Sequence, residues 1–231
     1  MKLISLKMNN QDGFTLVEVL VALVVAMVVS AAAYAAYKVQ QRTSTVQQQV
    51  TEIQQNVRAA IEIMSRDFRM AGYDPTAEGR YTIDVATVNS FQFTADLCEN
   101  GGDPKAYGVT CGTGPFPAQN LDEQYFFQLS GNTLLRTTGA PQSAIAENIE
   151  RVELLYILEN GTTSLAPIGP QRDNIRAVRV SILGRAGQPD YKYTNTTSYI
   201  TGSGVTLPLF NDNFRRRMLI KTIYCRNMGL I

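Results

Sequence analysis

The sequence predicts an α+β protein in which one long N-terminal α-helix packs on an antiparallel β-sheet head. Three observations lead to this prediction. No proline interrupts the chain between Phe14 and Ala71, the apolar residues in the second half of that segment recur at helical spacing, and beyond Tyr73 the pattern changes to short alternating runs. The part after the helix is long enough for one sizeable core, so we expect one head domain over residues 73–231.

The first part of the predicted helix has the length and composition of a membrane span. From Phe14 to Ala36 the run holds no charged residue except Glu18. About 20 apolar residues suffice to cross a bilayer as a helix. We therefore expect a membrane-spanning helix over residues 14–37.

A short basic leader, residues 1–13, precedes this run. Lys2 and Lys7 outweigh Asp12, and basic residues before a first span favour the cytoplasmic side of the membrane. A secretory signal carries its cleavage site after the apolar core, whereas here Gly13 stands before it. The apolar segment is therefore expected to stay on the mature protein, with the head across the membrane.

Residues 38–72 are predicted to continue as an amphipathic stem helix. Their apolar residues step by three or four, at Val50, Ile53, Val57, Ile61, Met64 and Phe68. Gly72, followed by Pro75, marks the expected end of the helix. One apolar stripe favours packing on a sheet, and a coiled coil or an unstructured stalk are the alternatives.

The head is predicted to be mostly antiparallel β. Short alternating runs indicate strands over residues 81–88, 91–95, 124–130, 133–138, 149–158, 174–183 and 217–226. Gly131 and Asn132 separate the third and fourth of these runs, which predicts a tight hairpin.

The junction of leader and apolar run carries the most specific motif, Gly13-Phe14-Thr15-Leu16-Val17-Glu18. It resembles the class III signal of type IV prepilins and of the related pseudopilins. The resemblance implies that a prepilin peptidase cuts after Gly13 and methylates the new N-terminal residue, Phe14. It also implies that Glu18 acts in subunit assembly. The alternative is an ordinary signal-anchor helix with an accidental glutamate.

A carboxylate within an apolar span is costly, so such residues usually have a partner and a function. Cleavage after Gly13 would create an ammonium group on Phe14, and Glu18 of a neighbouring subunit could pair with it. A buried ion pair is better suited to setting register than to adding net stability. We therefore expect Glu18 to set the stagger between subunits.

Other segments resemble narrower families. Residues 59–73 resemble the end of the stem helix in PilW-type minor pilins, and residues 217–227 resemble the C-terminal strand of that family. Residues 146–153 and 175–180 resemble sheet segments shared by PilW-type minor pilins and J-type pseudopilins of type II secretion. Residues 96–123 and 185–213 match no segment of these families and are expected to be variable loops.

Three cysteines occur in a part of the chain that would face an oxidising compartment. Cys98 and Cys111 flank one loop and are the natural disulfide pair by proximity. Cys225 would then be a buried residue of the last strand, or it would pair with one of the other two. The sequence leaves all three pairings open.

The sequence gives no support to an enzyme, a cofactor site or a metal site. Histidine is absent, which removes Ser-His and Cys-His nucleophile systems and most zinc sites. Acidic residues cluster loosely in one loop without the ligand spacing of a calcium site, at Asp96, Glu99, Asp103, Asp122 and Glu123. A net charge of +1 does not favour nucleic-acid binding. Residues 215–217 are three consecutive arginines, which could bind a phosphate or an acidic partner. The preferred interpretation is a solvated strand edge.

The resemblance implies a structural function. The expected role is a minor pilin that joins or primes type IV pilus assembly, with the prepilin peptidase, other minor pilins, the major pilin and an inner-membrane assembly platform as partners. Its expected location is the bacterial inner membrane, as a single-pass protein with a periplasmic head, and then the pilus, with the tip as one candidate position. The alternatives are a J-type pseudopilin of a type II secretion system and a membrane-tethered periplasmic binding or sensor module.

Overall fold

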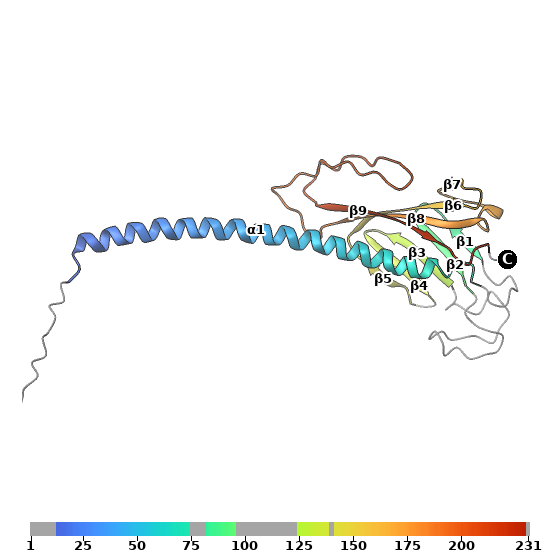
Figure 1. The fold of residues 1–231 in the computed structure, drawn as a ribbon, viewed down its shortest axis with the longest axis horizontal. Coiled ribbons are helices and arrows are strands. Elements are labelled where there is room, and N and C mark those ends of the chain that lie inside the picture. The colour runs from blue at the N-terminus through green and yellow to red at the C-terminus, as the bar shows by residue number, and fades with distance from the viewer. Residues whose placement is uncertain (1–12, 74–81, 96–123, 139–140, 230–231) are drawn as a thin grey trace, which may run out of the picture. The chain divides into compact units, whose positions relative to one another are not determined.

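The computed structural model describes residues 13–73, 82–95, 124–138 and 141–229. The chain divides into two compact units at Gln47 and Gln48. Each unit is described by itself. The first contains the apolar part of the long helix, and the second contains the remainder of that helix together with all the strands (Figure 1).

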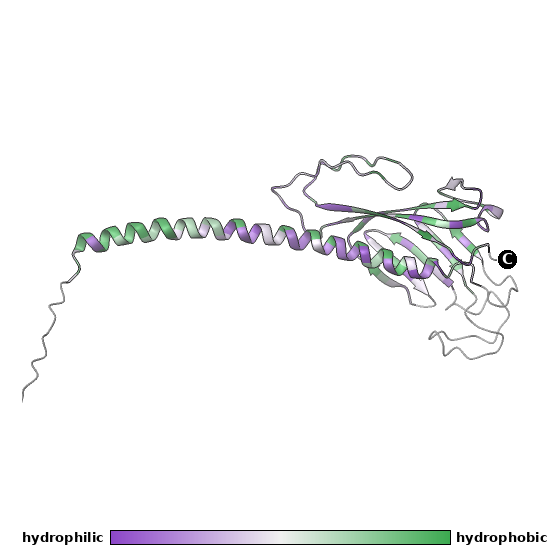
Figure 2. Cartoon of the chain, viewed as in Figure 1, coloured by the Kyte–Doolittle hydropathy of each residue, from purple (hydrophilic) through white to green (hydrophobic). Residues whose placement is uncertain are grey.

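The long helix α1 runs from Leu16 to Phe68, close to the predicted 14–72. Figure 2 shows the change along it, from a continuously apolar first part to alternating polar and apolar residues. This helix is long and apolar enough, by length and composition, to cross a membrane. Tight turns follow its end, and Gly72 has a φ of 79°. A Cβ there would lie 2.6 Å from the Met228 sulfur, so this stop position requires glycine.

The predicted antiparallel β-structure is confirmed, and the nine strands among the described residues are divided between two sheets. The first sheet has the order β1-β2-β3-β4-β5, with bounds Ile83–Ala86, Ser90–Thr94, Gln124–Ser130, Thr133–Thr138 and Ser143–Ala146. The second has the order β7-β6-β8-β9, with bounds Thr163–Ser164, Ile149–Leu158, Ile175–Arg185 and Arg216–Tyr224. A short 3-10 helix, Gly169–Gln171, precedes β8.

The predicted bounds of β3, β4 and β6 are confirmed residue by residue, and the predicted hairpin joins β3 to β4 with Ser130 opposite Thr133. Two short strands, β5 and β7, were not predicted. Each has four residues or fewer, which is too short for an alternating pattern to stand out.

The second half of α1 packs on both sheets. Its buried residues follow the predicted stripe, and Phe68 at the end of the helix is fully buried. The Phe68 ring meets Phe91 of β2 and Phe127 of β3 edge-on, at centroid distances of 4.9 and 5.2 Å. Such edge-to-face pairs add to the free energy gained from burial. This aromatic cluster fixes the end of α1 against the first sheet.

Contact between α1 and the second sheet depends on Gly184 of β8. A Cβ at Gly184 would lie 2.6 Å from Val57 and 3.0 Å from Ile53, both on α1. The missing side chain therefore lets the helix approach the strand closely, which explains a glycine inside this strand.

Tyr156 of β6 joins the two sheets. Its hydroxyl donates to the carbonyl oxygen of Thr87, in the turn between β1 and β2, and to that of Ser90, the first residue of β2, at 2.9 and 3.1 Å. The Leu154 N–H donates to the Val88 oxygen in the same turn, at 2.7 Å. The sheets are therefore connected by hydrogen bonds as well as by their shared core.

Residues 186–215 cover the outer face of the second sheet. Tyr199 and Leu207 pack on Leu183 of β8 in a small second core. A Cβ at Gly202 would lie within 2.8 Å of side-chain atoms of Arg179 and Ser181, so the loop backbone rests directly on the sheet. The sequence predicted only a variable loop here, whereas the structure has an ordered cover.

Candidate functional site

The bond between Gly13 and Phe14 lies outside helix α1. The helix begins at Leu16. Gly13 and Phe14, the two residues of the bond, are both exposed, Phe14 to 88%. A Cβ built on Gly13 would meet no atom within 4 Å. A peptidase needs a substrate backbone that is not already committed to helical hydrogen bonds, and this bond meets that requirement.

Thr15 and Glu18 form a reciprocal cap at the start of α1. The Thr15 N–H and hydroxyl donate to Glu18 Oε2 at 2.9 and 3.0 Å, and the Glu18 N–H donates to the Thr15 hydroxyl at 3.3 Å. This is a capping box, which satisfies N–H groups that a helix start otherwise leaves unpaired. Glu18 therefore has a local structural role in addition to the assembly role that the sequence predicts.

Sequence reasoning missed the contribution of Thr15. The signal was present, because Thr-x-x-Glu immediately before an apolar run is the sequence signature of a capping box. Both side-chain bonds go to Oε2 of Glu18. Among the described residues no hydrogen bond reaches Oε1, so this oxygen is available to a cation from outside the chain.

The apolar part of α1 has no protein cover in a single chain. Large apolar side chains are more than half exposed all along it, at Leu16, Val17, Val19, Leu20, Val21, Leu23, Val24, Val25, Met27, Val28 and Val29. A surface of this kind is stable only in lipid or against other apolar helices. The helix therefore needs either a membrane or neighbouring subunits.

Several predicted site residues cannot be placed. Cys98, Cys111 and the loop carboxylates between Asp96 and Glu123 lie outside the described residues. Within the described ranges, no group of three or more metal-ligating side chains could hold an ion. Cys225 is a free thiol with 2% of its surface exposed, and burial raises its pKa to about 12.

The interpretation of residues 215–217 as a solvated strand edge is wrong for Arg216. Its side chain is 1% exposed and pairs with Glu150 and Asp212 through two nitrogens each. The guanidinium also stacks on Phe210 at 3.8 Å. Arg216 is buried because the covering loop brings Asp212 and Phe210 over it, and no local sequence pattern could show this.

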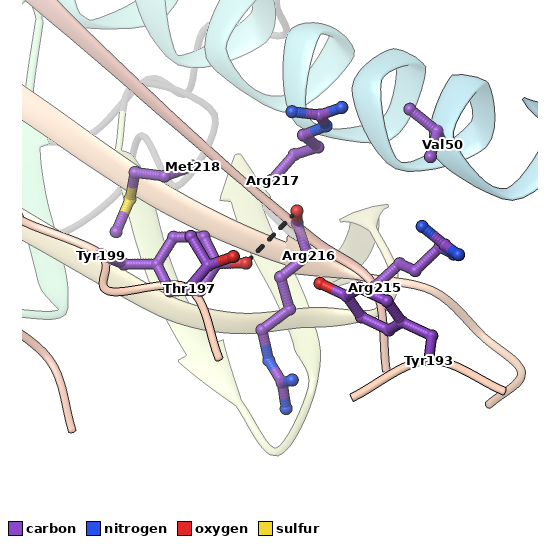
Figure 3. Close-up of a pocket in the computed structure, with 8 residues that line it drawn as sticks. All are labelled: Val50, Tyr193, Thr197, Tyr199, Arg215, Arg216, Arg217 and Met218. Carbon is purple, nitrogen blue, oxygen red and sulfur yellow. Dashed lines mark hydrogen bonds between the residues drawn. The ribbon is translucent and has the colours of Figure 1, made fainter. Parts of the chain in front are cut away.

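Arg215 and Arg217 are arranged differently. Arg215 pairs with Asp190 at 2.8 Å and stacks on Tyr193. Arg217 is exposed and has no ion pair with a described residue. Figure 3 shows them at a pocket of about 330 Å³, whose lining is Val50, Tyr193, Thr197, Tyr199, Arg215, Arg216, Arg217 and Met218.

One family of known proteins shares the motif. Residues 8–34 match the family described as the prokaryotic N-terminal methylation motif. A solved type IV-like pilin from Thermus thermophilus is similar to the chain, with a TM-score of 0.47 and 17% identity over 76% of this chain and 97% of that one. A search of curated proteins finds no significant match. The methylation motif, followed by one long helix and antiparallel sheets, supports a type IV pilin-like protein.

Proposed function

We propose that this chain is a minor pilin, a structural subunit that joins or primes type IV pilus assembly after its leader is removed. The observation that carries the proposal is the geometry of the methylation motif. An exposed, non-helical Gly13–Phe14 bond stands directly before a capped apolar helix, and the cap includes the one carboxylate of the apolar run.

Processing would convert this N-terminus into an assembly element. Cleavage by a prepilin peptidase would leave Phe14 as the first residue, with a methylated amino group. The uncommitted Oε1 of Glu18 would then accept this ammonium from a neighbouring subunit. Within an apolar filament core an unpaired charge is strongly unfavourable, so only the register that pairs both groups would be stable.

The capping box gives this pairing a defined starting geometry. Thr15 holds Glu18 Oε2 at the helix start, which limits the directions that the carboxylate can take. A side chain already fixed in position loses less conformational entropy when it binds. We therefore assign Thr15 a positioning role in assembly.

The minor role and the partners follow from the family resemblance of the head and stem. The chain would enter the bacterial inner membrane through residues 14–37, with its β-rich head in the periplasm, and then leave the membrane for the filament. It would contact other minor pilins, the major pilin and the inner-membrane assembly platform. The role is structural and requires no catalytic step by the chain itself.

A J-type pseudopilin of a type II secretion system is the second candidate. The same processing motif serves both kinds of filament, so deletion of the gene in its native host would separate them. Loss of surface pili with normal export of secreted enzymes supports the pilus role. Normal pili with blocked export would assign the chain to secretion.

A Glu18→Ala variant tests the assembly step. We expect the leader to be removed normally, as judged by intact mass, while the protein in sheared filaments falls to background. Thr15→Ala is the matched control for capping, because it removes both hydrogen bonds of the Thr15 hydroxyl and keeps the carboxylate, and it should reduce incorporation only partly. Glu62→Ala, an exposed carboxylate on the same helix, should have no effect. Full incorporation of Glu18→Ala would refute the pairing.

A further inference from the structure

Strand β9 is the one long strand at a sheet edge within the described residues. The two sheets end in β1, β5, β7 and β9. The first three contain four residues or fewer, whereas β9 contains nine. Natural proteins keep edge strands short because unpaired backbone groups offer a template for another strand. A nine-residue edge therefore needs an explanation.

The register of β9 shows which of its backbone groups face outward. At one end of the β8–β9 pair the Cys225 N–H donates to the Arg176 carbonyl oxygen. At the other end the Ala186 N–H donates to the Arg215 carbonyl oxygen. In an antiparallel pair the hydrogen-bonded positions alternate, so the odd-numbered residues of β9 bond β8 and the even-numbered ones point away. The Arg216 carbonyl confirms this, because it accepts from the Tyr199 hydroxyl of the covering loop at 3.5 Å (Figure 3).

Beyond Arg216 the outer edge of β9 is open. The outward N–H and C=O groups of Met218, Ile220, Thr222 and Tyr224 have no backbone partner among the described residues. Two apolar side chains beside this edge are exposed, Ile220 to 42% and Tyr224 to 67%. The edge therefore offers both hydrogen-bonding groups and apolar contact area to an added strand.

The charges beside this edge select its partner. Strand β9 contains no acidic residue and carries Arg217 and Lys221 on the face opposite Ile220. Lys221 has only a loose pair with Glu62, at 3.6 Å, in which the Glu62 side chain is 80% exposed. The pocket beside Arg217 also contains Arg215, but that side chain already pairs with Asp190 at 2.8 Å, so Arg217 and Lys221 are the cations available to a partner. Like charges on paired strands are destabilising, so pairing of β9 with the β9 of a second copy is disfavoured.

We propose that the β9 edge is a docking site for an extended acidic segment of another protein, which adds as an antiparallel or parallel strand beside Met218–Tyr224. Backbone hydrogen bonds from the even-numbered residues would hold the segment, as in other cases of strand addition. Its acidic side chains would face Arg217 and Lys221. This inference does not depend on the pilin role.

The test uses the full chain in neutral detergent micelles and two fluorescein-labelled nine-residue peptides. One peptide alternates Val with Glu, and the other alternates Val with Lys. We expect the Glu peptide to bind at least about tenfold more tightly by fluorescence anisotropy, a difference of about 1.4 kcal/mol. Arg217→Glu should weaken binding about threefold, the typical effect of one cross-strand charge pair.

Ile220→Pro separates edge pairing from charge attraction. The Ile220 N–H points away from β8, so proline removes an outward donor and leaves the β8–β9 ladder intact. We expect binding to fall about tenfold, while Ile220→Ala, which keeps the N–H, stays closer to the parent chain. An unchanged melting temperature of both variants shows that the fold is retained.

Three results would overturn the proposal. They are equal binding of the two peptides, undiminished binding by a folded Ile220→Pro chain, and a homodimer of the parent chain in light scattering that Ile220→Pro abolishes. The last result would assign the edge to a second copy. None of these results bears on cleavage after Gly13, so the proposed pilin role is tested separately.

Discussion

Arg136 Nε donates to Asp67 Oδ2 over 2.6 Å, which joins the last turn of α1 to β4 of the first sheet. The two side chains are unequally buried, with Asp67 5% exposed and Arg136 22% exposed. Arg136 is held further by Thr138 and by the ring of Tyr125. The end of α1 is therefore held to the first sheet by this ion pair as well as by the aromatic contacts of Phe68.

Removal of Arg136 should destabilise the fold more than removal of Asp67. Arg136→Ala leaves the buried Asp67 carboxylate with only the exposed Arg66, whose Nε lies 3.8 Å from Oδ1, and breaking a buried pair costs about 3 kcal/mol. Asp67→Asn leaves an arginine that can turn toward water, so its cost should be smaller. Urea unfolding, monitored by tyrosine fluorescence, measures the free energy of unfolding of each variant, since the chain contains 11 tyrosines and no tryptophan. Equal losses would contradict the unequal burial.

Two aspartates should change stability with pH in opposite directions. Burial raises the pKa of Asp67 above its usual 3.8, against the opposing effect of Arg136. Its contribution to the free energy of unfolding is therefore full below pH 3.8 and lost as pH rises through the higher folded pKa. Hydrogen bonds from Arg216 lower the pKa of Asp212, so its contribution is present above pH 3.8 and lost as pH falls through the lower folded pKa.

The measurement compares parent and asparagine variants in urea at a series of pH values. The free energy of unfolding of the parent minus that of Asp67→Asn should fall as pH rises above 3.8. The free energy of unfolding of the parent minus that of Asp212→Asn should rise as pH rises toward 3.8. Slopes of the same sign for both variants would show that one of the two electrostatic assignments is wrong.

Tyr156→Phe should weaken the connection between the two sheets. The variant keeps the buried ring and removes the hydroxyl donor from the Thr87 carbonyl, whereas the Ser90 carbonyl still accepts from the Thr87 N–H. A loss of about 1 to 3 kcal/mol is expected for buried groups left unpaired. Tyr191→Phe is the matched control, because Tyr191 is 84% exposed. A loss of the same size in both variants would count against the assigned hydrogen bonds.

Cys225 should resist alkylation in the folded chain. Its thiol is buried and burial raises its pKa to about 12, so almost no reactive thiolate is present near neutral pH. Iodoacetamide followed by intact mass should show no label on Cys225 until urea is added. If Cys98 and Cys111 form the proposed disulfide, the unfolded, unreduced chain should then take one label, whereas three labels would exclude that pair.

The parts of the fold that follow local rules could be predicted from sequence. The apolar run, the stripe from Val50 to Phe68 and the stop at Gly72 predicted α1 to within four residues at its end. Long alternating strands such as β6 were equally clear. These features depend on periodicity and on single residues of restricted conformation, which are visible in the chain itself.

The parts that depend on distant residues could not be predicted. The division into two sheets is fixed by contacts such as Tyr156 with Thr87, which lie 69 positions apart. Burial of Arg216 depends on Glu150, 66 positions away, and the open side of β9 depends on strand order. At the candidate processing site, the residues were predictable from the motif, but the local cap between Thr15 and Glu18 was overlooked.

The most direct test of the pilin role is the N-terminus of the protein in its native host. Mass spectrometry of the chain from membranes should find N-methylated Phe14 as the first residue, and this form should disappear in a strain without the prepilin peptidase. An unprocessed N-terminus that retains the leader in both strains would contradict the proposal and favour a membrane-tethered periplasmic module.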